Sequence, residues 1–258
     1  MSSRIASDAN PFHYQERVVA FIDVLGFAER VKQSDANQTA RDKVSKLIVV
    51  NKLFERFVRE FLRFADAAFF SDSFVLSMRS PEGQLIYLIR ETGYLCRYLL
   101  LQGLPCRGAI ATGSLYHDGR FVVGPALVEA YRLEQSVAIY PRIILDEATM
   151  AYWKDEFLLD EFGQGCAHQQ CEALVKRDRD GQHFLDIFNP EWPNFFPWTE
   201  FIPSTDSVPT DPFEFCKEAM KRIADGRAEN IGNAKVLAKY EWLATQCEER
   251  AVALIDKR

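Results

Sequence analysis

Features that mark several protein classes are missing from this sequence. No segment approaches the roughly 18 uninterrupted apolar residues of a membrane span, and the first residues lack the apolar core of a secretory signal peptide. Asp and Glu (37) outnumber Lys and Arg (31), and the net charge of −6 argues against non-specific nucleic-acid binding. We therefore expect a bacterial-type cytoplasmic protein that binds neither membranes nor nucleic acids.

The six cysteines show no disulfide framework, as expected of free thiols in a reducing compartment. Two groupings resemble known sites but favour plainer interpretations. Cys166, His168 and Cys171 look like part of a zinc cluster, yet no fourth ligand stands nearby. His117 and Asp118 look like a catalytic dyad, yet they suit a polar hairpin turn.

The hydrophobic pattern predicts strands and helices in a definite order. Strands are expected at 17–24, 64–70, 73–79, 106–115, 119–124, 138–146, 172–177 and 182–188, and helices at 38–62, 81–101, 125–135 and, as an amphipathic pair, within 211–256. The order strand–helix–strand–strand–helix–strand is typical of the split βαβ, or ferredoxin-like, arrangement. The expected fold class is α+β. Residues 1–16 would form an arm, 17–188 the main domain, and 189–258 an aromatic and proline-rich segment followed by helices packed on that domain.

Two aspartates stand beside apolar, strand-like runs. Asp23 lies in Phe-Ile-Asp-Val-Leu-Gly-Phe (21–27), and Asp72 lies in Phe-Phe-Ser-Asp-Ser (69–73). Because these runs can pair in one sheet, we expect the two carboxylates to meet at its edge. A hard divalent cation, Mg²⁺ or Mn²⁺, carrying a phosphorylated substrate would relieve their repulsion. Taken alone, Asp72 would also suit a plain turn.

Together with two further motifs, these runs resemble the class III nucleotidyl cyclase catalytic domain over residues 17–188. The further motifs are Arg107-Gly108-Ala109-Ile110 with Gly113, and Gly124-x-x-x-Val128-x-Ala130-x-Arg132-Leu133-Glu134. The sequence is still more similar to the pyrimidine cyclases of bacterial anti-phage (Pycsar) systems. The shared patterns are Phe-Ile-Asp-x-Leu-Gly-Phe, Ser-Asp-Ser, Gly-Pro-Ala-Leu-x-Glu-Ala-Tyr and Tyr-Pro-Arg-Ile, at 21–27, 71–73, 124–131 and 140–143.

The resemblance implies an enzyme that converts a nucleoside triphosphate to a 3′,5′-cyclic nucleotide and pyrophosphate. Two ions per site, Mn²⁺ or Mg²⁺, would be held by Asp23, Asp72 and the main-chain carbonyl of Val24. Arg132 would stabilise the transition state, although an arginine on a solvated helix face is the plainer alternative. In this family the site lies between two subunits, which implies a homodimer.

The same resemblance places the phosphates of the substrate. Main-chain amides near Gly26 and Phe27 suit phosphate oxygens. The cation that holds the terminal phosphates is expected at the late hairpin, from Lys176, Arg177 or Arg179. A solvated turn is the alternative for these three residues.

Two positions that read a purine in this family are apolar here. Ala68 replaces a lysine four residues before the second metal position, and Phe121 replaces an aspartate three residues before the helix glycine. Phe121 would shorten the pocket to suit a one-ring base. Asn51, on the helix after the first strand, is a candidate reader of uracil or cytosine, since an amide can flip to suit either.

The function that follows is a uridylate cyclase, with a cytidylate cyclase as the closely related choice. Cyclic UMP or cyclic CMP would signal phage infection to a separate effector protein. A purine cyclase is an alternative that Ala68 and Phe121 disfavour. An inactive, cyclase-like nucleotide sensor is another, because Val128 stands where the family carries an asparagine.

Overall fold

The computed structural model describes residues 13–62, 64–79, 84–119, 121–158, 174–190, 192 and 208–255. The strands are β1 (Gln15–Val24), β2 (Ala65–Phe70), β3 (Ser73–Arg79), β4 (Cys106–Asp118), β5 (Phe121–Val123), β6 (Ile143–Leu145), β7 (Val175–Arg177) and β8 (His183–Leu185). The helices are α1 (Phe27–Gln33), α2 (Gln38–Phe61), α3 (Gln84–Leu101), α4 (Pro125–Ser136), α5 (Glu147–Leu158), α7 (Pro212–Glu229) and α8 (Ala234–Ile255). Most expected elements are thus present to within a few residues.

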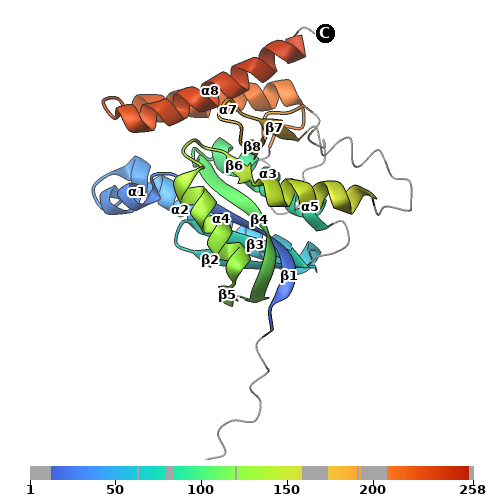
Figure 1. Cartoon of the computed structure of the whole chain (residues 1–258). Coiled ribbons are helices and arrows are strands. Elements are labelled where there is room, and N and C mark those ends of the chain that lie inside the picture. Colours follow the sequence, from blue (N-terminus) through green and yellow to red (C-terminus); the bar gives the residue numbers. More distant parts are fainter. Residues whose placement is uncertain are drawn as a thin grey trace, which may run out of the picture.

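One sheet with helices on both faces organises this mixed α/β chain (Figure 1). The strand order is β2-β3-β1-β4-β6-β8-β7, and β5 pairs with β4 beside this path. β1 pairs antiparallel with β3 and β4, whereas β4 and β6 are parallel. In the part of the chain that the structure describes, none of the helices has the length and apolar character needed to span a bilayer.

The alternation of side chains along β1 decides which face each residue reaches, because successive residues of a strand point to opposite faces. The even-numbered residues Val18, Ala20, Ile22 and Val24 enter the main core, which also contains α2 and α3. Val19 packs in a second cluster with α4 on the other face. Asp23 shares the parity of Val19 and therefore lies on the α4 face, at the end of the strand.

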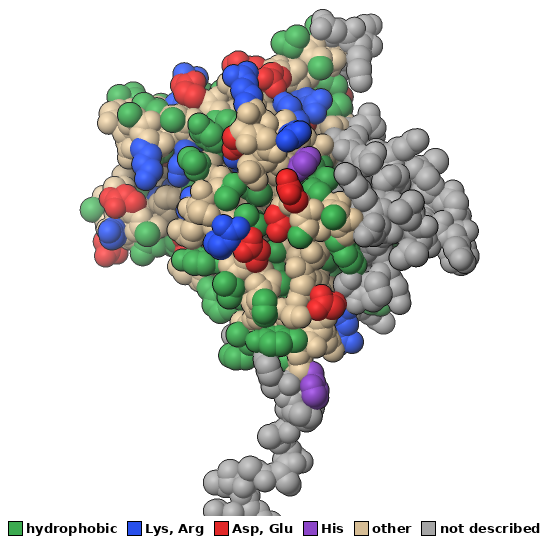
Figure 2. Space-filling view, viewed as in Figure 1, with side chains coloured by type: hydrophobic (Ala, Val, Ile, Leu, Met, Phe, Trp, Pro, Cys, Tyr) green, Lys and Arg blue, Asp and Glu red, His purple; other side chains and the backbone are tan. Residues whose placement is uncertain are grey.

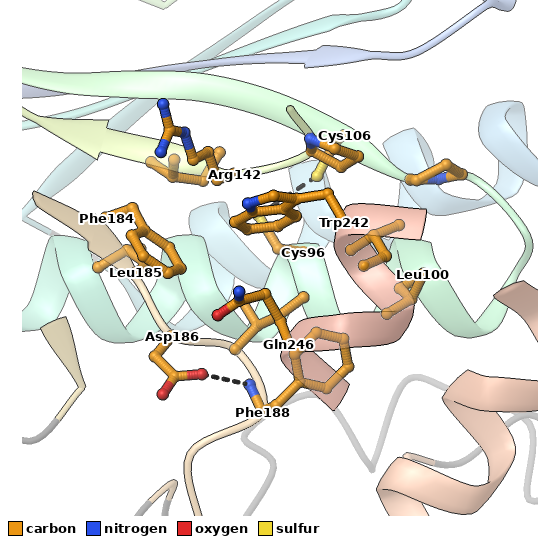
Figure 3. A pocket seen from close by; sticks show the side chains of 15 residues that line it. Cys96, Leu100, Cys106, Arg142, Phe184, Leu185, Asp186, Phe188, Trp242 and Gln246 are labelled. Atoms are coloured by element: carbon orange, nitrogen blue, oxygen red, sulfur yellow. Dashed lines mark hydrogen bonds between the residues drawn. The ribbon is translucent and has the colours of Figure 1, made fainter. Parts of the chain in front are cut away.

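The C-terminal helices α7 and α8 close the main core. Phe215, Ile223, Tyr240, Leu243 and Cys247 are buried in it. On α8, Trp242 stacks on Tyr140 with ring centroids 5.7 Å apart, and its Nε1 donates to Asp178 at 3.2 Å. Figure 3 shows Trp242 and Gln246 pointing from α8 into a small cavity of about 20 Å³ beside Phe184. These contacts, with that of Trp242 to Phe184, fix α8 against β8, the β7–β8 turn and the segment before β6.

Two expectations around β6 are wrong. The strand expected at 138–146 is only Ile143–Leu145, because two preceding amides bond locally: Ile139 N–H donates to Val137 O and Arg142 N–H to Tyr140 O, both at 2.8 Å. The sequence does not predict helix α5, because Asp146 is expected to end the strand. In the structure Asp146 instead caps this helix. Its side chain accepts from Thr149 N–H at 2.7 Å. Residues 80–83, where the helix expected at 81–101 would begin, lie outside the described residues, as do 166–171 and most of 189–212.

His117 and Asp118 do not form a hairpin turn, because β4 extends through both. His117 is buried, with its Nδ1 2.8 Å from Ser77 Oγ and its Nε2 3.1 Å from the Gly119 carbonyl oxygen. Since a carbonyl only accepts, Nε2 carries the proton and Nδ1 accepts from the serine hydroxyl. Burial is the main cause that lowers the pKa of His117 to about 4, so the ring is neutral at pH 7.

We expect His117 to make the fold acid-sensitive between pH 6.5 and 4. The ring of the unfolded chain binds a proton near its ordinary pKa of 6.5, whereas the folded ring resists protonation until about 4. Its stabilising effect is therefore present above pH 6.5 and lost as the pH falls towards 4, at a cost of up to about 3 kcal/mol. Urea titrations at pH 7 and pH 5 measure this. Between these pH values the free energy of unfolding of His117→Gln should fall by about 2 kcal/mol less than that of wild type. The control His13→Gln, at an exposed histidine, should behave like wild type. An equal fall in His117→Gln and wild type would contradict the prediction.

Candidate metal and nucleotide site

The end of β1 and the turn between β2 and β3 bring Asp23 and Asp72 together. Asp23 stands opposite Ser73 in the β1–β3 register. The main-chain carbonyl of Asp72 accepts from Val24 N–H at 3.1 Å, and Ser73 Oγ donates to Asp23 Oδ1 at 3.2 Å. The two apolar runs therefore pair in one sheet, as the sequence predicts, and bring the two aspartates together where β1 ends and β3 begins.

The turn that carries Asp72 holds an uncommon backbone conformation. Ser71 has φ of 58°, the one positive value for a non-glycine residue within the described ranges. This region costs such a residue roughly 1–2 kcal/mol, and it persists where the surroundings fix it. Here the pairing of Phe70 with Ser73 closes the turn, so the position of Asp72 is set by the backbone.

The carboxylate of Asp23 is poorly neutralised by the protein. Burial, then Asp72 and Glu134, raise its pKa to about 6, and Arg107 with the Ser73 hydroxyl compensates only in part. Arg107 stands opposite Asp23 on β4, but its Nη2 lies 2.6 Å from Oε1 of the fully buried Glu134. Because this guanidinium is already paired, the two aspartates remain short of positive charge.

A divalent cation fits the aspartate pair by donor chemistry. Both side chains offer oxygen, which Mg²⁺ and Mn²⁺ prefer, and Mg²⁺ is commonly held by one or two carboxylates together with substrate phosphates. No group of three or more His, Cys, Asp or Glu able to hold a metal occurs among the residues placed by the structure. The other ligands would therefore be the Val24 carbonyl, water and phosphate.

Gly26 and Phe27 follow the aspartate strand directly. Gly26 adopts φ of 72°, a left-handed conformation that suits glycine, at the turn before α1. It is exposed, whereas the Phe27 side chain is buried. Arg30 donates to the Leu25 carbonyl and braces this turn. The main-chain amides of the turn thus lie just after Asp23, where phosphate binding is predicted.

Two other predicted residues, Phe121 and Arg132, are exposed. Phe121 is 63% exposed on β5, which pairs with the Asp118 end of β4, whereas Asp23 pairs with Arg107 near the other end (Figure 1). Arg132 is exposed on α4 and donates to both carboxylate oxygens of Glu129, at 2.6 and 2.8 Å. Within one chain, Phe121 is therefore far from Asp23 along β4, whereas Arg132 lies on the helix whose Glu134 acts on the pKa of Asp23.

The remaining predicted substrate residues lie in varied surroundings. Ala68 is fully buried in the apolar cluster beneath α4. Asn51 Oδ1 is buried and has no hydrogen-bond partner among the described residues. Lys176 Nζ lies 2.7 Å from Glu249 Oε2 of α8, and Arg177 donates to a carbonyl of its own hairpin. Substrate contact by each of these residues stays a prediction.

The sequence analysis does not predict three charged residues of the site: Arg107, Glu134 and Lys239. Glu134 could have been noticed, because it falls among the buried residues of α4 with Ala130 and Leu133. Lys239 is half-buried on α8, and the charges that act on its pKa include Arg107, Asp23 and Glu134. No local pattern connects Lys239 with Asp23, since the two are far apart along the chain.

Comparisons with known proteins do not establish a family. No protein-family model matches the chain, and no curated protein matches it. Among solved structures it is similar to "crystal structure of the catalytic core of a rhodopsin-guanylyl cyclase with converted specificity in complex with ATPalphaS". Identity is 16%, the match covers 55% of this chain and 83% of that chain, and the TM-score is 0.39. A TM-score this low carries no argument about function.

Proposed function

We propose that the protein is a pyrimidine nucleotide cyclase of the class III type, which converts UTP or CTP to the 3′,5′-cyclic monophosphate and pyrophosphate. The pairing of Asp23 and Asp72 at the end of β1 carries the proposal, because burial and mutual repulsion create a demand for a divalent cation there. The strand order β2-β3-β1-β4, with α2 and α3 in the core on one face, supports a split βαβ arrangement.

The reaction is an intramolecular displacement at phosphorus. The ribose 3′-oxygen forms a bond to the α-phosphorus, the bond from that phosphorus to pyrophosphate breaks, and the hydroxyl proton passes to water. Asp23, Asp72 and the Val24 carbonyl would hold two divalent ions, and main-chain amides at Gly26 and Phe27 would orient the phosphates. Bound ions would supply Lewis acidity towards the hydroxyl and the phosphate oxygens.

The choice of a pyrimidine is supported by the absence of purine-reading groups. Ala68 and Phe121 offer no hydrogen bond to a base. The buried, unpartnered Oδ1 of Asn51 is an acceptor available to a ligand, which supports its part in base recognition. UTP is preferred to CTP on the sequence resemblance.

A second copy of the chain would complete the site. Phe121 lies on β5, away from Asp23 of the same chain, and the exposed Arg132 of α4 pairs with Glu129. Large apolar side chains are exposed on these two elements. Their exposed fractions are 63% for Phe121, 37% for Val123, 66% for Val128 and 51% for Tyr131. Figure 2 shows hydrophobic side chains over the lower part of the face in view, where Figure 1 places β5 and α4. Exposed apolar groups on adjoining elements favour burial against a partner, and we infer a homodimer in which each chain lends Arg132 to the other.

The cyclic nucleotide would act as a cytoplasmic second messenger in bacterial anti-phage defence, read by a separate effector protein. The role is that of the Pycsar systems that the motifs at 21–27 and 71–73 resemble. The effector would have to be a cyclic-nucleotide-binding protein.

Product analysis tests the proposal. Purified protein is incubated with Mn²⁺ and ATP, GTP, CTP or UTP separately, and the products are identified by mass spectrometry. We expect cyclic UMP, or cyclic CMP, from wild type and at least about a thousandfold less from Asp72→Asn. The control Asp42→Asn, which makes the same substitution on the exposed face of α2, should form product like wild type. A purine product would overturn the interpretation of Ala68 and Phe121. Nucleotide binding without any product would favour the nucleotide sensor.

A further inference from the structure

A cavity of about 570 Å³ lies between the first helices and the C-terminal helices. Its walls come from Leu25 and Gly26 after β1, from α1 and the start of α2, from Pro105 and Pro141, and from the α7–α8 turn with the start of α8. This volume is within the range of small-molecule and cofactor sites. Because Leu25 follows Asp23 by two residues, the cavity lies beside the proposed metal ligands.

The lining of the cavity is rich in basic side chains: Arg30, Lys43, Lys235 and Lys239, with Glu29 and Glu229 as the acidic ones. Two of the four cations are engaged within the protein, since Lys43 pairs with Glu229 and Arg30 donates to the Leu25 carbonyl. Lys235 and Lys239 form no ion pair with any residue that the structure places. The C-terminal helix α8 therefore presents two unpaired ammonium groups to the cavity.

The position of Lys239 on α8 is set by neighbouring anchors. Trp242 and Leu243 follow it by three and four residues, hence on the same side of the helix, and both pack on the domain. Lys239 itself is half-buried, and its pKa is lowered by burial, by Arg107 and by Lys235, against opposite contributions from two carboxylates. Positive charge is thus concentrated at the wall between the cavity and Asp23, which suits a polyanion.

We propose that this cavity binds the polyphosphate tail of the nucleoside triphosphate, and that Lys239, assisted by Lys235, is the cation that holds the terminal phosphates. The identity of the nucleotide rests on the proposed function, whereas binding of a polyphosphate rests on the cavity and its charges alone. The C-terminal helices become part of the substrate site. The role expected of Lys176 passes to Lys239, because Lys176 is bound to Glu249 and Gln246.

Calorimetric titration of the full chain with inorganic tripolyphosphate tests the cavity without nucleotide or catalysis. Loss of one ammonium–phosphate contact should raise Kd about tenfold in Lys239→Met, and Lys239→Arg should retain most of the affinity. The matched control is Lys221→Met, which removes an exposed lysine of α7 that pairs with Glu218; its Kd should equal that of wild type. Thermal unfolding verifies that the variants are folded.

Steady-state kinetics with UTP and Mn²⁺ provide a second measurement. Lys239→Met should raise KM about tenfold and lower kcat by less than about threefold, since it removes substrate binding and leaves the metal ligands in place. Unchanged tripolyphosphate affinity in Lys239→Met would overturn the inference whatever the enzyme does. Weakened tripolyphosphate binding in a protein that forms no cyclic nucleotide would uphold the cavity assignment and contradict the proposed function.

Discussion

Asp72→Asn is expected to lower cyclase activity at least about a thousandfold and to raise the melting temperature of the metal-free protein. Activity falls while stability rises because the Asp72 carboxylate binds the cation and does not stabilise the fold. Its negative charge is, after burial, the next largest cause that raises the pKa of Asp23. Removing that charge relieves repulsion in the empty protein while taking away a ligand for the cation.

Rates of product formation and thermal unfolding without and with Mn²⁺ measure this pair of effects. Wild type should be stabilised by Mn²⁺, and Asp72→Asn should lose most of that stabilisation. The exposed Asp42→Asn should match wild type in both measurements. A variant that loses stability together with activity would show that Asp72 is a structural turn residue, contrary to the assignment.

Arg132→Ala is expected to lower activity about a hundredfold to a thousandfold, the usual effect of losing a group that stabilises transition-state charge. The loss should be recoverable by a second defective chain. A heterodimer of Arg132→Ala with Asp72→Asn contains one site with both defects and one with none, so it should show about half of wild-type activity. Co-expression with two affinity tags and tandem purification supplies this heterodimer.

The matched control for the heterodimer pairs Asp23→Asn with Asp72→Asn. Both defects then fall on the metal-binding side, so each of the two sites lacks one metal ligand and activity should not recover. Activity in the first heterodimer and none in the second would support a shared site. Absence of recovery in the Arg132→Ala heterodimer would contradict the exchange of Arg132 between chains.

The proximity of Asp23 and Asp72 could be predicted because it follows from local sequence patterns. The apolar runs around Asp23 and Asp72 are long enough to be strands, and the short Ser71-Asp72 turn forces β2 and β3 to pair. Once β3 lies beside β1, the register places Ser73 opposite Asp23. Short-range pattern and one strand pairing were sufficient for this part of the site.

The rest of the site depends on contacts between distant segments, which leave no local pattern. Lys239 reaches the site because α8 docks through Trp242 and Leu243, and the fully buried Glu134 pairs with Arg107 of β4. Helix α5 was missed for a related reason. Asp146 suits a strand end and a helix cap equally well, and the observed hydrogen bond to Thr149 decides between them.

A count of bound Mn²⁺ tests the central claim, that Asp23 and Asp72 hold divalent cations for a nucleotide, most directly. Electron paramagnetic resonance of free Mn²⁺ would follow a titration in the presence of a UTP analogue with a methylene group between the α and β phosphorus atoms. The account predicts about two ions per chain for wild type and fewer than one for Asp72→Asn. Equal occupancy in the two proteins would contradict it.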